Sequence, residues 1–286
     1  MANLKEIRLR ITSVGSTMQI TSAMKMVSAA KLKRAQDAII QMRPYANKLT
    51  ELLKNLSASV DSSDGGVYTQ EREIKNVLLV TVTSNRGLCG GFNAYIIKKA
   101  KALINEEYAN ANVGILSIGK KSSEHFTKNG FNVASTHDAL FGDLTFNNVA
   151  KVAEGIMEKF VEGDYDEVVL VYNQFKNAAT QIIMNENFLP VHAPENESEV
   201  VDYIFEPTKQ EIVEQLIPKS LKTQLFKAVL DSHAAEHGAR MTAMHKATDN
   251  ASELKKELTL TYNKARQAAI TNEILEIVGG AEALSG

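Results

Sequence analysis

The chain has 286 residues, of which 44% are hydrophobic and 23% are charged, and its formal net charge is −2. This composition is typical of a globular protein with a sizeable core, and it argues against a disordered chain. No apolar run approaches the ~18 residues that a membrane span requires.

Residues 1–60 are predicted to form one very long helix, interrupted in composition only by Gly15 and Pro44. At 1.5 Å per residue, such a helix is roughly 80–90 Å long, which is too long to bury its apolar stripe within an ordinary domain. The apolar residues recur at alternating steps of three and four, as in a heptad seam. They are Leu4, Ile7, Ile11, Val14, Met18, Leu32, Ala35, Ile39, Met42, Ala46, Leu49, Leu53 and Leu56.

The seam changes composition between Met18 and Leu32. Its inward positions become polar, at Thr21, Lys25 and Ser28. Nearby apolar residues instead spread around the helix: Ile20, Met24, Met26 and Val27. A helix that is apolar on several sides is surrounded by protein. The surrounding protein is either the chain's own head domain or a sleeve of other subunits, and the pattern does not distinguish them.

The same helix is strongly basic. Residues 1–60 hold ten Lys and Arg against three Asp and Glu, with a cluster at Lys25, Lys31, Lys33 and Arg34. Such a face can simply be solvated. Because the charge is of one sign, we expect an acidic partner surface. Nucleic acid is disfavoured, since the helix has almost no aromatic residues and no base-reading motif.

Residues 75–200 alternate between apolar strands and amphipathic helices, which predicts a Rossmann-like domain with an open, mostly parallel sheet. The last two strands are compatible with a hairpin. The expected strands are Val77–Val82, Val113–Ile118, Phe131–Ala134, Asp166–Tyr172 and Gln181–Phe188, and the expected helices are Asn93–Glu107, Ser122–Lys128 and Phe146–Val161.

Residues 209–286 are predicted to form a second long helix. Pro218 marks a kink or a restart, and Gly279-Gly280 would normally end the helix. Between Ala239 and Val278 there is neither Gly nor Pro, which allows roughly 60 Å of helix. Its apolar positions include Leu254, Leu258, Ala265, Ala268, Ile270, Ile274, Ile277, Ala281 and Leu284. The fold class expected is therefore α/β: a long antiparallel coiled coil of the N- and C-terminal helices, with the Rossmann-like domain inserted between them.

Three short motifs suggest chemistry. The Gly-rich loop S-N-R-G-L-C-G-G-F-N at 84–93 follows a strand and precedes a helix, where α/β proteins bind phosphates, but it fits neither established phosphate-binding spacing. His233 and His237 belong to an H-x-x-E-H pattern, a zinc-protease motif that lacks a third ligand here. Cys89 has no His or Asp placed to activate it. We expect no catalytic residue, no metal site and no cofactor.

The cysteine count and the N-terminus bear on location. A single cysteine cannot form an intramolecular disulfide, which indicates a reducing compartment. The first residues enter the helical pattern directly, without signal- or transit-peptide character. We expect a cytosolic protein unless a partner holds it elsewhere.

Longer stretches resemble a known family. The run T-M-Q-I-T-S-A-M-K-M-V-S-A-A-K-L from Thr17 to Leu32 closely resembles the N-terminal helix of the γ subunit of F-type ATP synthase. The Gly-rich loop is similar to that family's S-D-R-G-L-C-G-G-F-N, with Asn85 where Asp is usual. The run Y-N-K-A-R-Q-A-A-I-T-N-E from Tyr262 to Glu273 resembles the family signature, and the resemblance extends over the whole chain.

The resemblance implies a central-stalk rotor subunit that transmits torque between the proton-driven c-ring and the α3β3 hexamer. Catalysis would belong to the β subunits, and the partners would be α, β, ε and the c-ring, at the cytoplasmic face of a bacterial plasma membrane. The alternative is a coiled-coil scaffold with a nucleotide-binding head. The contacts implied are Met24 and Lys25 near the β lever, Arg240, Arg266, Gln267, Thr271 and Glu273 at the β catch region, and Tyr203 and Glu206 at the c-ring foot.

Overall fold

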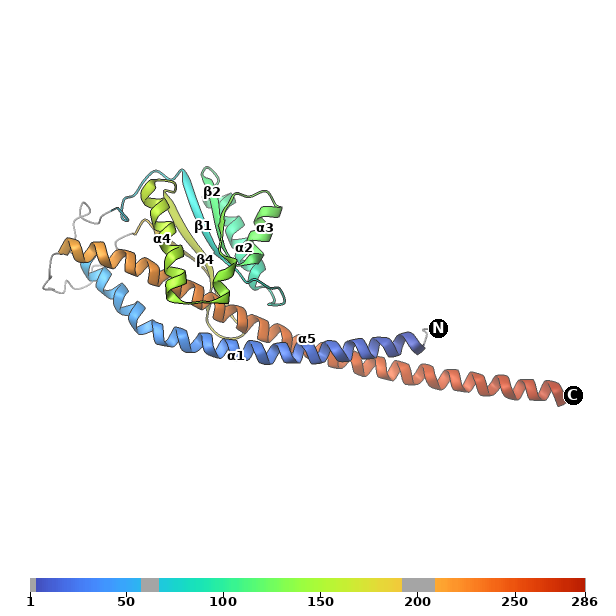
Figure 1. The fold of residues 1–286 in the computed structure, drawn as a ribbon. Coiled ribbons are helices and arrows are strands. Elements are labelled where there is room, and N and C mark those ends of the chain that lie inside the picture. Colours follow the sequence, from blue (N-terminus) through green and yellow to red (C-terminus); the bar gives the residue numbers. More distant parts are fainter. Residues whose placement is uncertain (1–3, 58–66, 192–208, 286) are drawn as a thin grey trace. The chain divides into compact units, whose positions relative to one another are not determined.

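The computed structural model describes residues 4–57, 67–191 and 209–285 (Figure 1). It divides into two compact units: residues 28–240, and residues 1–27 together with 241–286. Two long helices, α1 (Leu4–Ser57) and α5 (Lys209–Ser285), pass through both units. Within the described residues, no helix has both the length and the apolar character of a membrane span.

The 28–240 unit contains a five-stranded sheet in the order β3-β2-β1-β4-β5. The first four strands are parallel, and β5 pairs with β4 as an antiparallel hairpin. This confirms the open, mostly parallel sheet. The strands are β1 (Asn76–Val82), β2 (Asn112–Ile118), β3 (Val133–Thr136), β4 (Glu167–Phe175) and β5 (Gln181–Leu189).

Helices cover both faces of this sheet, so β1 and β4 are continuous apolar runs rather than alternating ones. On one face lie α4 (Phe146–Glu162) and residues 217–229 of α5 (Figure 1). On the other lie α2 (Phe92–Ala102), α3 (Lys120–Lys128) and the π-helical turn η1 (Leu103–Glu107). A short 3₁₀ turn, η2 (Asp138–Gly142), follows β3.

The third strand begins two residues later than the sequence indicated. Phe131, expected to start it, instead packs edge-on against Phe126 of α3 with ring centroids 5.3 Å apart. The ladder between β2 and β3 is also irregular, shifting register between Ile115 and Leu116. Packing of the half-buried Phe131 ring against α3 therefore overrides the local apolar pattern.

The heptad seam of α1 keeps its phase through the polar stretch. Thr21 and Ser28 are buried and Lys25 is half-buried, in line with buried Ile7, Leu32 and Leu49. The side chains of Leu53 and Leu56 lie outside the described residues. The inward positions of α5 beyond residue 240 follow the same period: Met244, Thr248, Ala251, Lys255, Leu258, Tyr262 and Ala265.

Contacts between α1 and α5 fix their antiparallel direction in each unit. In the unit of residues 1–27 and 241–286, Thr248 Oγ1 lies 2.8 Å from Thr21 Oγ1, and a Cβ on Gly15 would lie 3.7 Å from Lys255 Nζ. In the 28–240 unit, Lys219 Nζ lies 5.8 Å from the centre of the Tyr45 ring. Residue numbers fall on one helix as they rise on the other, as the antiparallel coiled coil requires.

Helix α5 is continuous from Lys209 through Pro218 and through Gly279-Gly280 to Ser285. Of the two expectations for Pro218, the restart is therefore wrong, and the two glycines lie inside the helix rather than at its end. Two glycines cost roughly 2 kcal/mol relative to alanine in a helix interior. That cost does not end a helix in which the surrounding residues are strong helix formers.

Candidate functional site

The Gly-rich loop lies at the topological switch point, where α/β proteins bind ligands beyond the carboxyl ends of their strands. Here β1 has β2 on one side and β4 on the other. The loop connects β1 to α2, whose N-cap is Gly91. The side chains of α5 occupy this crevice: Ala235 and Ala239 pack against Cys89, Phe92 and Phe175.

Arg240 closes the same crevice. Its Nη1 donates to the carbonyl oxygen of Gly87, and its Nη2 donates to that of Arg86 at 3.2 Å and to Glu236 Oε1 at 2.5 Å. The Arg240 and Glu236 side chains are only 10% and 11% exposed. A phosphate at this switch point would need the volume that α5 fills. The geometry therefore disfavours the alternative of a nucleotide-binding head.

Asn85 bridges two segments at the same end of the sheet. Its Nδ2 donates to the carbonyl oxygen of Asp138 at 2.7 Å, and its Oδ1 accepts from the backbone N–H of Lys120 at 3.0 Å. An amide can donate and accept, whereas an ionised carboxylate can only accept. The departure from Asp at this position thus has a structural explanation.

The H-x-x-E-H pattern is a packing cluster. The two Nε2 atoms of His233 and His237 lie 3.1 Å apart, and the Phe141 ring stacks on His233 at 5.8 Å. Glu236 turns away to pair with Arg240. In the part of the chain that the structure describes, no group of three His, Cys, Asp or Glu is placed to hold a metal ion.

Burial keeps both histidines neutral. It lowers the pKa of His233 to about 4, with a smaller contribution from Lys31. It lowers the pKa of His237 to about 3, with His233, Lys31 and Arg240 adding to the effect. Burial also raises the pKa of the Cys89 thiol. A thiol held in its neutral form is a poor nucleophile.

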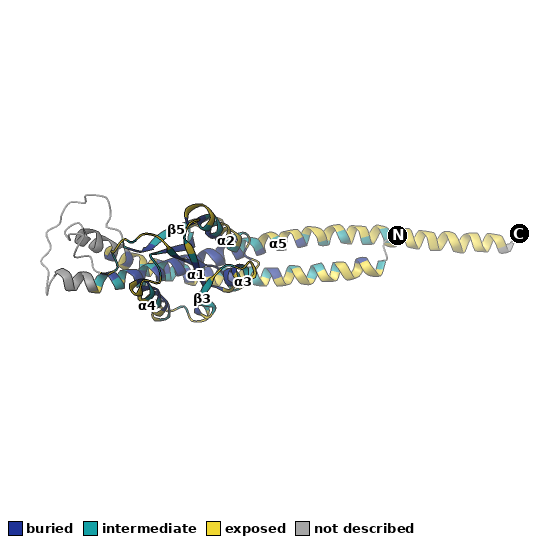
Figure 2. Cartoon of the chain, turned by 90° about the horizontal axis from the view of Figure 1, so that it is seen from above, coloured by how far each residue is buried: buried dark blue, intermediate teal, exposed yellow. Residues whose placement is uncertain are grey.

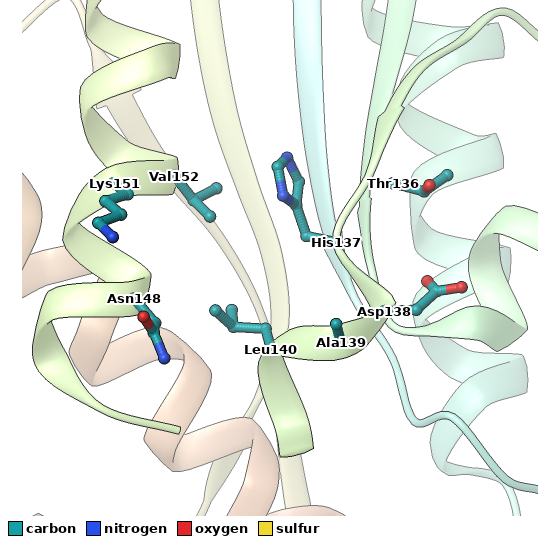
Figure 3. Close-up of a pocket in the computed structure, with 8 residues that line it drawn as sticks. All are labelled: Thr136, His137, Asp138, Ala139, Leu140, Asn148, Lys151 and Val152. Atoms are coloured by element: carbon teal, nitrogen blue, oxygen red, sulfur yellow. The ribbon is translucent and has the colours of Figure 1, made fainter. Parts of the chain in front are cut away.

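A pocket of about 400 Å³ lies between η2 and α4 (Figure 3). Lys151 and Asn148 extend from α4 and Leu140 points toward that helix, while Asp138 is directed away from it. Burial, more than the nearby charge of Lys159, lowers the pKa of His137. The polar groups do not converge on one point, so we assign no chemistry to this hollow. Its lining is Thr136, His137, Asp138, Ala139, Leu140, Asn148, Lys151 and Val152.

The contacts predicted for the two long helices fall into three groups. Met24 and Lys25 are half-buried on α1, and Arg240 is 8% exposed and engaged by its own chain. Tyr203 and Glu206 lie outside the described residues. Four are exposed on the last turns of α5: Arg266, Gln267, Thr271 and Glu273.

Apolar side chains are exposed along parts of both helices. On α1, Ile20, Met26 and Val27 are 60%, 65% and 58% exposed. On α5, every residue from 266 to 283 is exposed (Figure 2). That stretch includes Ile270, Ile274, Leu275, Ile277 and Val278. Contiguous exposed apolar surface of this kind marks an interaction site.

Comparisons with known proteins agree on one family. Residues 3–284 match the ATP synthase family. The ATP synthase gamma chains of Flavobacterium johnsoniae and Christiangramia forsetii are 65% and 59% identical, with 100% of each chain covered. The fold is similar to a rotor chain of the Euglena gracilis mitochondrial ATP synthase, with a TM-score of 0.69, 23% identity and coverage of 93% of this chain and 98% of that one. A central stalk/c-ring structure of the Tetrahymena thermophila enzyme matches with a TM-score of 0.60, 26% identity and coverage of 80% and 99%.

Proposed function

This chain belongs to the family of ATP synthase gamma chains, and we propose from that premise that its two long helices carry torque inside a sleeve of alpha and beta subunits. It is a non-catalytic, central-stalk rotor subunit. Catalysis takes place in the beta subunits. The shaft biases each of them through open and closed states in turn, because each rotor angle favours a different conformation.

The exposed apolar surface supports the sleeve. Within the unit of residues 1–27 and 241–286, Ile20, Met26 and Val27 are more than half exposed, so the pairing of α1 with α5 does not bury them. The family relationship favours a sleeve of other subunits as the protein that covers them. The exposed turns from residue 266 to residue 283 extend the same argument, since their isoleucines would be covered only by partner chains.

The remaining contacts are assigned by family resemblance. We propose Met24 and Lys25 for the beta lever, and the exposed group Arg266, Gln267, Thr271 and Glu273 for the beta catch region. A beta contact of Arg240 stays a prediction, and its hydrogen-bond partners in the structure are intramolecular. The basic stretch of α1 suits acidic loops of the beta subunits.

The head completes the rotor. We propose that residues 75–200 form a domain carried by the coil of residues 1–60 and 209–286, and that it contacts the epsilon subunit and the c-ring, with Tyr203 and Glu206 at the foot. Membrane association then occurs only through the complex. The cytoplasmic face of a bacterial plasma membrane is the proposed location, because the two gamma chains compared above come from bacteria.

Reconstitution tests this function. The chain is mixed with alpha and beta subunits from a matched bacterium, and particle size and ATPase activity are measured. A stoichiometric complex whose activity is absent from this chain alone is expected. The paired change Ile20→Asp/Val27→Asp is expected to leave the isolated chain stable and to weaken assembly at least tenfold. Asn110→Asp, an exposed change in the head, serves as the control. Failure of the wild-type chain to join the particle would overturn the proposal.

A further inference from the structure

The inference concerns how α5 is fixed within the 28–240 unit. Rotation of a helix about its own axis is resisted by side chains that project into its surroundings. Residues 217–229 of α5 pack into the core of the head with large apolar side chains, whereas the residues that meet the Gly-rich loop and the turn between β4 and β5 are small: Ala235, Gly238 and Ala239. Small residues permit close approach, but they offer little that interlocks with the opposing surface.

Besides the Gly-rich loop, α5 closely approaches the head at a second point, the turn between β4 and β5. A Cβ on Gly238 would lie 3.2 Å from Ala178 Cα and 3.4 Å from the ring of Phe175. These two residues lie at the turn between β4 and β5. Over this stretch the helix therefore meets two loops of the head through small residues, whose packing opposes rotation of the helix weakly. The larger side chains of α5 that oppose rotation lie at residues 217–229.

Arg240 is the long side chain at the end of this stretch. Its guanidinium donates to the consecutive carbonyls of Arg86 and Gly87, and the Nη2 that donates to Arg86 also donates to Glu236. The planar donor fork of arginine suits such paired acceptors and fixes direction as well as distance. Both charged side chains are about nine-tenths buried, so solvent does not compete for these bonds.

The loop that Arg240 holds is itself anchored to the head. Ser84 Oγ donates to the Arg86 carbonyl at 2.7 Å, and Asn93 Oδ1 accepts from the Ser84 backbone N–H at 2.9 Å. Leu88, the next residue after the clamped pair, has φ +64°. A leucine in this left-handed region is strained and is retained only where its surroundings determine it. The loop is thus a stiff bridge.

We propose that Arg240 is the positioning residue that fixes the stretch of α5 from residue 235 to residue 240 rotationally to the head, so that torque passes between this stretch and the Gly-rich loop through the 86–87 carbonyls. Arg240 is the last residue of the 28–240 unit, and α5 continues beyond it into the other unit. This inference rests on the rotor function above. It differs from a beta contact of Arg240, because the partners of the guanidinium are in this chain.

The first test uses the complete ATP synthase reconstituted in vesicles. ATP hydrolysis and ATP-driven proton pumping are compared for wild type, Arg240→Gln, Arg240→Lys and the exposed control Lys246→Gln. Arg240→Gln is expected to keep hydrolysis within twofold and to lower pumping per ATP at least threefold, because the head lags behind the helix. Arg240→Lys is expected to be intermediate. An unchanged ratio in Arg240→Gln overturns the proposal.

The second test separates this rotational fixing of α5 from a beta contact. Ala235→Cys or Ala239→Cys is combined with Arg240→Gln, since both alanines pack with Cys89. Oxidation with copper phenanthroline joins Cys89 to the introduced thiol. The disulfide is expected to restore pumping per ATP to at least half the wild-type value, and thiol reduction to abolish the gain. A cross-linked particle without recovery overturns this role of Arg240.

The third test uses the isolated chain and does not require the ATP synthase complex. A negative result would therefore reject the role of Arg240 without rejecting the rotor function. In the isolated chain, amide hydrogen exchange of residues 86–91 is expected to accelerate at least tenfold in Arg240→Gln and to stay unchanged in Lys246→Gln. Equal protection in all three chains would show that Arg240 does not hold the loop. If wild type failed to join the alpha–beta particle, the rotor function itself would be rejected.

Discussion

Thr248 on α5 donates its hydroxyl to the hydroxyl of Thr21 on α1, at 2.8 Å, in the middle of an otherwise largely apolar seam. Thr21 in turn donates to the carbonyl oxygen of Met18 at 3.1 Å. A polar pair at one inward position of a coiled coil specifies register, because a shifted pairing would leave its hydroxyls facing apolar side chains. The polar stretch of α1 thus continues the seam and fixes its alignment with α5.

Valine substitutions test this pair. Thr248→Val is expected to cost about 1 kcal/mol of local opening free energy, because Thr21 loses a partner. Thr21→Val/Thr248→Val is expected to cost less than the sum of the single changes, with a coupling energy of about 1 kcal/mol. Hydrogen exchange of amides 18–24 and 245–251 measures both. Thr261→Val, at an exposed position bonded only within its own helix, is the control. Additive effects would contradict the pairing.

Gly119 occupies a position that only glycine can take. Its φ is +105°, and a Cβ there would lie 2.0 Å from the carbonyl oxygen of Thr83. Gly119→Ala is expected to lower the free energy of unfolding by roughly 4 kcal/mol or more, because backbone atoms must move. Gly155→Ala on α4, where a Cβ meets nothing within 4 Å, is expected to gain about 0.5–1 kcal/mol. Urea unfolding followed by circular dichroism compares them, and equal effects would refute the steric argument.

Asn85 is predicted to be preferred over the acid found in the family. In Asn85→Asp the carboxylate keeps the Lys120 N–H but faces the Asp138 carbonyl, 2.7 Å from the donor that is removed. The free energy of unfolding at pH 7.5 is expected to fall by about 1–2 kcal/mol. Asn110→Asp is the exposed control in the same urea titration. A variant as stable as wild type would mean that Asp138 finds another donor.

Element types were predictable from sequence because they depend on local periodicity, whereas the contacts at Arg240 were not. The steps of three and four specify α1, and buried strands β1 and β4 stand out as apolar runs. The bond from Arg240 to Gly87 spans 153 residues, and nothing local encodes it. Leu254 illustrates the same limit: it is apolar but 44% exposed, since the seam is set by the phase running from Met244.

The histidine pair predicts loss of stability in mild acid. The pKa of His233 is about 4 in the folded chain against about 6.5 unfolded, so the unfolded state binds more protons below pH 6.5. Stability is present above that pH and falls as pH drops toward 4, by about 2 kcal/mol at pH 5 for this residue. His233→Gln is expected to reduce the difference in unfolding free energy between pH 7.5 and 5 by that amount. The exposed His245→Gln should not, and an unchanged difference in His233→Gln would contradict the assignment.

Asp231 predicts the opposite pH dependence. Its side chain is buried, and its Oδ1 has no hydrogen-bond partner among the residues that the structure describes. Burial raises its pKa to about 6, although Lys227 and Arg43 oppose the shift. The folded state therefore binds the proton more tightly, so the stability this group contributes is complete below pH 4 and is lost as pH rises through 6. Asp231→Asn mimics the neutral form. It is expected to be about 2–3 kcal/mol more stable than wild type at pH 8 and nearly equal at pH 4, as measured by urea unfolding. A destabilised variant at pH 8 would mean that Arg43 and Lys227 stabilise the carboxylate by more than its burial costs.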